Sequence, residues 1–172
     1  MSGRHGTAPG DAGRGGSGTG PTPAGVGLAR LEAWPDAELA PLLAASAAEG
    51  WRHLARLAEE WRSGAQRFAG VGEGLCVARA ENTILAIGGV VADPYARKAE
   101  IARLRRVYVR PEARRRGVGA ALVRHLVASS APYFRELRLR AHEPGAAAFY
   151  EALGFEPVAH LEGATHRRVL AR

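Results

Sequence analysis

The chain has 172 residues, a length that suits one domain with its own hydrophobic core and is short for two. Its formal net charge is +7, almost entirely from arginine, because Lys98 is the only lysine. No apolar run reaches the ~18 residues of a membrane span and no N-terminal segment has the apolar centre of a secretory signal, so we expect a cytoplasmic protein without a membrane partner.

The N-terminal segment, residues 1–27, is dominated by Gly, Pro, Ser, Thr and Ala and has almost no large apolar side chain. Such a composition buries too little surface to fold, so we expect a disordered tail followed by one domain over residues 28–172. The run Val26–Leu31 at this boundary is a plausible first strand.

Two helices are predicted next. The first starts after Trp34-Pro35 and is broken by Gly50, and the second ends near Gly64. Their apolar residues recur at helical spacing: Leu39, Leu42, Leu43 and Ala47 in the first, and Leu54, Leu57, Ala58 and Trp61 in the second. We expect the two helices to pack as a pair.

Three strand-like runs follow, at residues 75–80, 84–92 and 101–109, separated by short turn sequences. They predict an antiparallel meander. Cys76, the only cysteine, lies in the first run, where the apolar pattern indicates a buried thiol. A single cysteine excludes an internal disulfide and argues against a cysteine-based zinc site, so no metal is expected.

The C-terminal part alternates between the two element types. We predict a helix over 118–130, a strand over 137–141, a helix over 145–153, and strands near Val158 and Val169. The full order, β-α-α-β-β-β-α-β-α-β-β, indicates a mixed α/β (α+β) domain.

The segment Arg114–Ala120 has the properties of a phosphate-binding loop. Pro111 ends the preceding strand, and Gly117 and Gly119 allow the backbone of the next helix start to approach an anion closely. Seven arginines lie between residues 103 and 116, which concentrates positive charge there. A solvated basic face and a glycine-containing helix start are the alternatives. The loop lacks the features of a dinucleotide-binding glycine motif and the Gly-Lys-Ser/Thr ending of a Walker loop.

Two motifs together resemble the GNAT superfamily of acyl-CoA-dependent N-acyltransferases. They are Val109-Arg110-Pro111 followed by Arg114–Gly119, and Phe149-Tyr150 followed by Gly154-Phe155. The resemblance covers residues 28–170 and implies a mixed, mostly antiparallel sheet of six to seven strands flanked by helices. It also implies acetyl-CoA as the acetyl donor and a small-molecule or peptide amine as the acceptor. A monomer and a homodimer are both compatible with it.

The resemblance also implies roles for individual residues. The strand end Val107, Tyr108 and Val109 would bulge and splay from the next strand, so that its backbone pairs with the pantetheine arm like a missing strand. A backbone N–H of Val107 or Val109 would stabilise the oxyanion. Tyr150 would protonate the departing thiolate. The remaining implied cofactor contacts are Arg114, Arg115, Arg116, Gly117, Val118, Gly119, Ala120 and Phe149. A family asparagine that contacts the cofactor falls near Glu143, where this chain departs from the pattern.

The general base is not evident from the sequence, because Arg103 occupies the position where many relatives carry a glutamate. Period-two alternation places Arg103 and Arg105 on the face of Val107 and Val109. Either the two arginines clamp an acidic acceptor, or they are structural and pair with acidic residues. The acidic partners considered are Glu73 and Glu100. The candidate bases are Glu73, Glu100 and His142, and Glu73 is also a candidate substrate contact.

Two further functions compete with an N-acetyltransferase. A non-catalytic acyl-CoA-binding module would account for Arg103 at the glutamate position. A nucleic-acid binder would account for the net charge, but the chain has no recognised reading motif and no aromatic stacking platform, so we expect no nucleic-acid partner.

Overall fold

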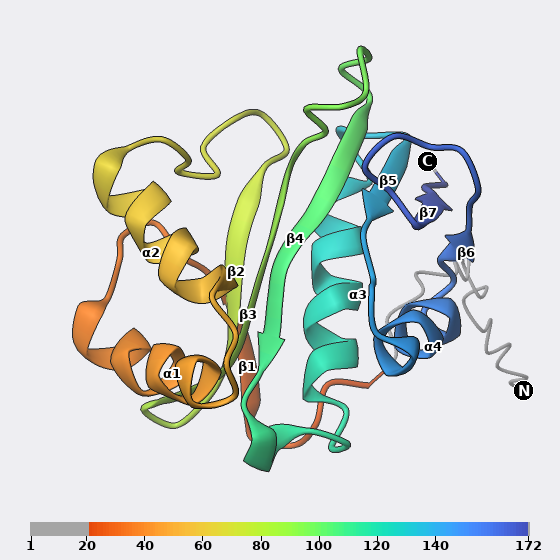
Figure 1. Cartoon of the computed structure of the whole chain (residues 1–172). Coiled ribbons are helices and arrows are strands. Elements are labelled where there is room, and N and C mark those ends of the chain that lie inside the picture. Colours follow the sequence, from red (N-terminus) through yellow and green to blue (C-terminus); the bar gives the residue numbers. More distant parts are fainter. Residues whose placement is uncertain (1–20, 172) are drawn as a thin grey trace, which may run out of the picture.

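The computed structural model of the chain describes residues 21–171, and most of the expected tail lies outside the described residues. Seven strands form one sheet in the order β1-β2-β3-β4-β5-β7-β6, with helices on both faces (Figure 1). The strands are β1 Val26–Arg30, β2 Gly74–Ala80, β3 Thr83–Ala92, β4 Ile101–Val109, β5 Glu136–Leu139, β6 Glu156–Pro157 and β7 His166–Val169. The helices are α1 Asp36–Ala48, α2 His53–Ser63, α3 Val118–Ser130 and α4 Pro144–Ala152, with a 3-10 turn η1 at Pro111–Ala113.

The element order is the predicted one, and the mixed, mostly antiparallel sheet is confirmed. Strands β1 to β4 form an antiparallel meander in sequence order, as the three successive strand-like runs predicted. Only β4 and β5 run parallel, because α3 connects them as a crossover on one face of the sheet. No helix within residues 21–171 has the length and hydropathy needed to cross a membrane.

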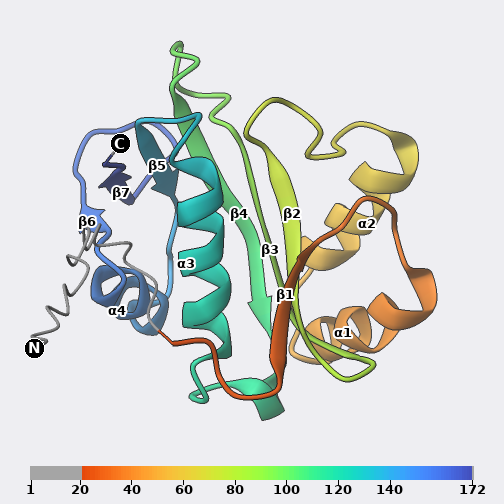
Figure 2. The same cartoon turned by 180° about the vertical axis from the view of Figure 1, so that it is seen from behind.

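Each face of the sheet has its own hydrophobic core. Helix α3 covers one face, with Leu122 and Leu126 among the buried residues (Figure 2). Helices α1 and α2 cover the other face and bury Leu39 and Leu57 there, so their predicted pairing is confirmed. Below, we call these the α3 face and the helix-pair face.

The C-terminal elements complete the α3 face beside β5. Strand β7 lies between β5 and β6, and α4 packs Phe149, Tyr150 and Leu153 against the α3 core. In Figure 1, α4 lies to one side of β4, and α1 and α2 lie to the other. Strand β4 is therefore the central strand of the sheet, with the helix pair on one side of it and α4 on the other.

Truncating the centre of the α3 core should destabilise the domain. Leu122 is fully buried between α3 and the sheet, so Leu122→Ala should lower the free energy of unfolding by about 3 kcal/mol through lost burial and a residual cavity. The matched control Val169→Ala removes a side chain that is 65% exposed and should change stability little. Urea denaturation of both variants measures the difference; equal effects would show that the α3 core is not the main source of stability.

Candidate active site

Strand β4 contains a β-bulge at Arg106 and Val107. Gly89 pairs with Arg105 and Ile87 pairs with Tyr108, so two residues of β4 lie opposite one residue of β3. Arg106 adopts the left-handed conformation, with φ of 59°. A bulge of this kind adds one residue to the strand and reverses the alternation of side chains beyond it.

The bulge corrects the predicted arrangement of the β4 side chains. Leu104, Val107 and Val109 pack in the α3 core, whereas Tyr108 packs in the helix-pair core. Arg106 also reaches the helix-pair face, where its guanidinium contacts Glu60 of α2 at 2.7 Å. Arg103 and Arg105 therefore do not share a face with Val107 and Val109, because strict period-two alternation does not hold across a bulge.

Strands β4 and β5 separate just before the bulge. Their pairing extends only from Ile101 opposite Glu136 to Arg103 opposite Arg138, while β4 continues to Val109. The edge of β4 from Arg105 to Val109 consequently has no strand beside it. Backbone N–H and C=O groups on such an edge are available to an extended ligand.

The glycine loop lies at the far end of this open edge. Gly117 caps the start of α3 with φ of 80°, and Arg115 also has a positive φ, of 57°, so the turn is tight. A Cβ at Gly119 would lie 3.0 Å from a Val109 methyl, so glycine lets the first turn of α3 approach β4 closely. Val118 and Gly119 are buried, Ala120 is half-buried, and Arg115, Arg116 and Gly117 are exposed. The exposed backbone at the start of α3 can accept an anion.

Arg114 joins this loop to α1. Its terminal nitrogens donate to the two carboxylate oxygens of Glu49 at 2.7 Å each, and its Nε donates to the Val109 carbonyl at 3.0 Å. Glu49 also accepts a 2.6 Å hydrogen bond from the Tyr108 hydroxyl. The Arg114 donors are therefore directed at Glu49 and at β4, and one carboxylate ties together the end of α1, the bulged strand and the loop.

Tyr150 lies on the other side of the open edge, on α4. Its ring is 5.1 Å from that of Phe149 and 5.7 Å from that of Phe155, and both pairs meet edge to face. Burial raises the pKa of Tyr150 to about 12. Its hydroxyl makes no hydrogen bond to another described residue, so at neutral pH it is a protonated donor without a protein acceptor.

Arg103 is buried and has partners from two loops. Its guanidinium pairs with Asp93 at 3.4 Å, donates to the Gly163 carbonyl at 2.8 Å, and lies 4.8 Å from the centre of the Tyr95 ring. It contacts neither Glu73 nor Glu100, the two partners expected from the sequence. Arg103 joins the β3–β4 loop to the β6–β7 loop, and its charge is compensated inside the protein.

Arg105 differs from its two arginine neighbours. It is half-buried, and within residues 21–171 it has no hydrogen bond or ion pair. Burial and the neighbouring Arg106 guanidinium lower its pKa, although an arginine stays charged at neutral pH. A desolvated guanidinium without a partner favours the binding of an anion.

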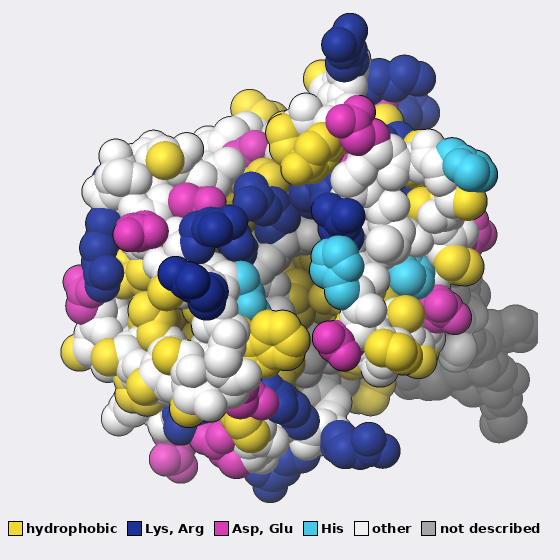
Figure 3. Space-filling model, viewed as in Figure 1, with side chains coloured by type: hydrophobic (Ala, Val, Ile, Leu, Met, Phe, Trp, Pro, Cys, Tyr) yellow, Lys and Arg dark blue, Asp and Glu magenta, His cyan; other side chains and the backbone are white. Residues whose placement is uncertain are grey.

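The space-filling view shows a hollow in the face that carries β4, between the α1–α2 side and the α4 side (Figure 3). Lys and Arg side chains gather along the helix-pair rim of this hollow and hydrophobic side chains lie inside it. The hollow matches the region where β4 has no neighbouring strand.

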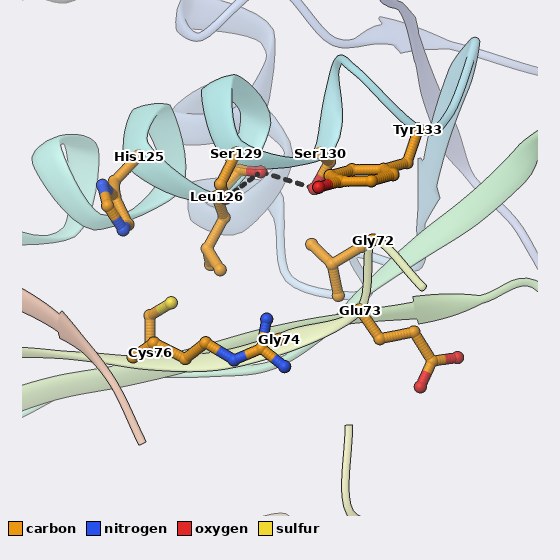
Figure 4. Close-up of a pocket in the computed structure, with 11 residues that line it drawn as sticks. Gly72, Glu73, Gly74, Cys76, His125, Leu126, Ser129, Ser130 and Tyr133 are labelled. Carbon is orange, nitrogen blue, oxygen red and sulfur yellow. Dashed lines mark hydrogen bonds between the residues drawn. The ribbon is translucent and has the colours of Figure 1, made fainter. Parts of the chain in front are cut away.

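A separate cavity of about 110 Å³ lies on the far side of α3, against β2 and β3 (Figure 4). Glu73 lines it, but its carboxylate points away and accepts hydrogen bonds from the backbone N–H groups of Gly70 and Ala92. Cys76 also borders the cavity; burial raises the pKa of its thiol to about 11, so it is protonated at neutral pH. The structure therefore does not bring Glu73 together with Arg105 or Tyr150.

The two other candidate bases are exposed, Glu100 in the turn before β4 and His142 in the segment between β5 and α4. Phe149 is half-buried near Gly119, since a Cβ on that glycine would lie 3.5 Å from its ring. Glu143, at the position of the family asparagine, is exposed and precedes α4.

Comparison with known proteins agrees with this geometry. A family model described as an acetyltransferase (GNAT) domain matches residues 72–157, half of the chain. A crystal structure of a protein assigned to the acetyltransferases, from Exiguobacterium sp. 255-15, is 32% identical, covers 84% of this chain and 93% of its own, and superposes with a TM-score of 0.73. The chain belongs to the GNAT family of acetyltransferases. It is thus a member of a family of acyltransferases.

More distant GNAT structures share the fold. A phosphinothricin acetyltransferase from Sinorhizobium meliloti, solved with AcCoA, is 20% identical, with coverage of 86% and 89% of the two chains and a TM-score of 0.65. An acetyltransferase from Streptococcus agalactiae is 15% identical, with coverage of 86% and 99% and a TM-score of 0.66. A comparison with curated proteins finds no match.

Sequence reasoning missed the acidic residues that organise this GNAT site, namely Glu49, Glu60 and Asp93. Each pairs with an arginine of β4 or of the following loop, at separations in sequence of 65, 46 and 10 residues. The spacing of residues along the sequence does not indicate which of them form pairs across such distances. His53 was missed for a similar reason, since only the fold brings it to Tyr108.

The tie at Glu49 predicts a pH dependence of stability. Hydrogen bonds from Arg114, and then from Tyr108, lower the pKa of Glu49 below its usual 4.5. A lowered folded-state pKa gives stability that is present above pH 4.5 and is lost as the pH falls through the folded value. Glu49→Gln should therefore reduce the free energy of unfolding at pH 7 by about 1 kcal/mol or less, since the pair reaches solvent.

The measurement is urea denaturation of wild type and Glu49→Gln at pH 7, 5, 4 and 3. The difference between them should shrink below pH 4.5. Glu162→Gln, at an exposed position without an ion pair among residues 21–171, is the control and should show no pH-dependent difference. A difference for Glu49→Gln that stays constant with pH would contradict the charged tie.

Proposed function

We propose that the protein transfers the acetyl group of acetyl-CoA to a primary amine, by direct attack in a ternary complex. The observation that carries this proposal is the open edge of β4, which begins at the bulge and leads to the glycine loop at the start of α3. An extended pantetheine arm fits the first feature and a pyrophosphate fits the second. Cytoplasmic location remains part of the same proposal.

The donor would lie along β4 as a substitute for a neighbouring strand. Backbone groups of Val107 to Val109 would pair with the amides of the arm. Residues Arg115 to Ala120 would hold the pyrophosphate, with Arg114 holding the loop in place through Glu49. Phe149, close to Gly119, would pack beside the arm.

The reaction requires three groups in place. The amine nitrogen attacks the thioester carbonyl carbon, and the oxyanion that forms is stabilised by a backbone N–H of Val107 or Val109 at the bulge. The carbon–sulfur bond then breaks, and the thiolate takes a proton from the Tyr150 hydroxyl. A pKa of about 12 keeps Tyr150 protonated at neutral pH, so its hydroxyl can donate to the sulfur as negative charge develops there.

The acceptor in this proposal carries a carboxylate or another acidic group. The sequence suggested that Arg103 and Arg105 together bind this acidic group. Because Arg103 is paired with Asp93, we assign this role to Arg105 alone. Arg105 is a half-buried cation on the helix-pair face of β4, without a hydrogen bond or ion pair to any residue of the described range 21–171. Guanidinium groups bind carboxylates through paired hydrogen bonds, which would orient the amine toward the thioester.

A screen of amines with acetyl-CoA and detection of free thiol tests the function itself. Activity is expected, together with an increase in melting temperature on addition of acetyl-CoA. The alternative, a non-catalytic acyl-CoA-binding module, predicts the same increase in melting temperature without release of thiol for any amine.

Removing the Tyr150 hydroxyl tests the acid. Tyr150→Phe should lower kcat by about a hundredfold, a usual effect of losing a general acid. Its affinity for acetyl-CoA, measured by calorimetry, should stay near that of wild type, because the ring and its contacts with Phe149 and Phe155 remain. Tyr133→Phe, at an exposed tyrosine beyond α3, is the matched control. An unchanged kcat in Tyr150→Phe would remove the assigned acid.

Paired acceptors test Arg105. γ-Aminobutyrate and n-butylamine have similar lengths and differ in the carboxylate, so wild type should have the higher kcat/KM for the acid. Arg105→Gln should lower kcat/KM for γ-aminobutyrate roughly tenfold or more, the usual loss of a charged hydrogen bond, and leave n-butylamine unchanged. Equal losses for the two amines would show that Arg105 does not recognise the acidic group.

A further inference from the structure

His53 is the first residue of α2 and lies against the bulged strand. Its ring centre is 6.0 Å from that of Tyr108 and 6.1 Å from that of Trp51, and both contacts are edge to face. Its Nε2 is buried and has no hydrogen-bond partner among residues 21–171. Buried polar atoms are nearly always paired, so an unpaired ring nitrogen on a side chain that packs against Tyr108 of the bulged strand calls for a partner that arrives with a ligand.

The carboxylates around β4 already accept hydrogen bonds from arginines or from backbone N–H groups, so they are not free to contact an incoming amine. The engaged pairs are Glu60 with Arg106, Asp93 with Arg103, Glu49 with Arg114 and Tyr108, and Glu73 with the backbone N–H groups of Gly70 and Ala92. The usual position of the family base is occupied by Arg103.

The surroundings of His53 keep its imidazole neutral. Burial, and then the Arg106 guanidinium, lower its pKa below the usual 6.5. The charged and titratable groups that face this corner are Arg106 and Tyr108 from β4, Glu49 from the end of α1, and Glu60 from α2 itself. Glu49 is bonded to Arg114 and Tyr108, and Glu60 is bonded through Oε1 to Arg106 while its Oε2 has no partner among residues 21–171; neither carboxylate forms a hydrogen bond with the His53 ring.

We propose that His53 is the base of the acyl transfer, accepting through Nε2 the proton that the acceptor nitrogen loses. The proposal rests on the proposed function. The nitrogen forms its bond to the acetyl carbon, the carbon–sulfur bond breaks, one proton passes from nitrogen to His53, and Tyr150 supplies one proton to the thiolate. His53 then releases its proton to solvent and Tyr150 regains one from solvent, so both residues return to their starting states. The acid Tyr150, on α4, and the base His53, on α2, thus lie on opposite sides of β4.

The test uses the full-length protein, acetyl-CoA and γ-aminobutyrate, with n-butylamine as a second acceptor. In wild type, kcat/KM should fall as the pH drops through the pKa of His53, below 6.5, because the imidazole becomes protonated. His53→Ala and His53→Gln should both lose about a hundredfold in kcat and lose this acidic limb. Added imidazole should restore His53→Ala, which leaves room for it, and should not restore His53→Gln.

His125→Gln is the matched control, since His125 lies on α3 at the separate cavity and should keep the wild-type rate and pH profile. Circular dichroism and the shift of melting temperature with acetyl-CoA establish that each variant is folded and binds the donor. Retention of the acidic limb in folded His53→Gln, or absence of imidazole rescue in folded His53→Ala, would overturn the proposal. Wild type that releases no thiol with any amine would instead refute the proposed function.

Discussion

The β-bulge in β4 is the constraint on which the candidate site depends. It places two residues of β4 opposite one of β3, and from that point the strand presents Val107 and Val109 to α3 and Tyr108 to the helix pair. It comes just after the last residue of β4 that pairs with β5. One local irregularity therefore opens an unpaired edge, directs hydrophobic residues to the side where the donor would lie, and places Arg105 and Arg106 on the opposite side.

The arginines that follow one another along β4 would repel each other if they were left uncompensated. Two carboxylates prevent this on the strand: Asp93 from the β3–β4 loop pairs with Arg103, and Glu60 from α2 pairs with Arg106. Glu49 from the end of α1 pairs with Arg114 in the loop that follows. The Asp93 pair is buried, so it is better understood as fixing the position of two loops than as a source of net stability. Charge compensation thus holds the parts of the site together. Arg105 is the member of the series left without a partner in the described chain.

Much of the fold could be predicted from the sequence because its signals are local. The bounds of β4 and α3 were predicted correctly, since a proline ends the one and glycines precede the other. The bulge was expected only from the family resemblance, at Val107 to Val109; the local sequence does not indicate it, because the residue with positive φ is Arg106, and arginine rarely adopts this conformation. The faces of Arg103 and Arg105 were consequently wrong. Partners such as Glu49 were missed because only the folded chain brings residues 49 and 114 together.

The presence of arginine where many relatives carry a catalytic glutamate then has a coherent physical consequence. Arg103 is paired with Asp93, so this position supplies no free carboxylate. Burial and the Arg106 guanidinium lower the pKa of the His53 imidazole, which keeps it neutral at pH 7 with a lone pair that can accept a proton. The same positive field attracts an acidic acceptor. A site rich in arginine can therefore favour amines that carry an acidic group. It can also keep its two proton-transfer roles apart, with a neutral base on α2 and a protonated phenol on α4, because their environments move the two pKa values away from each other.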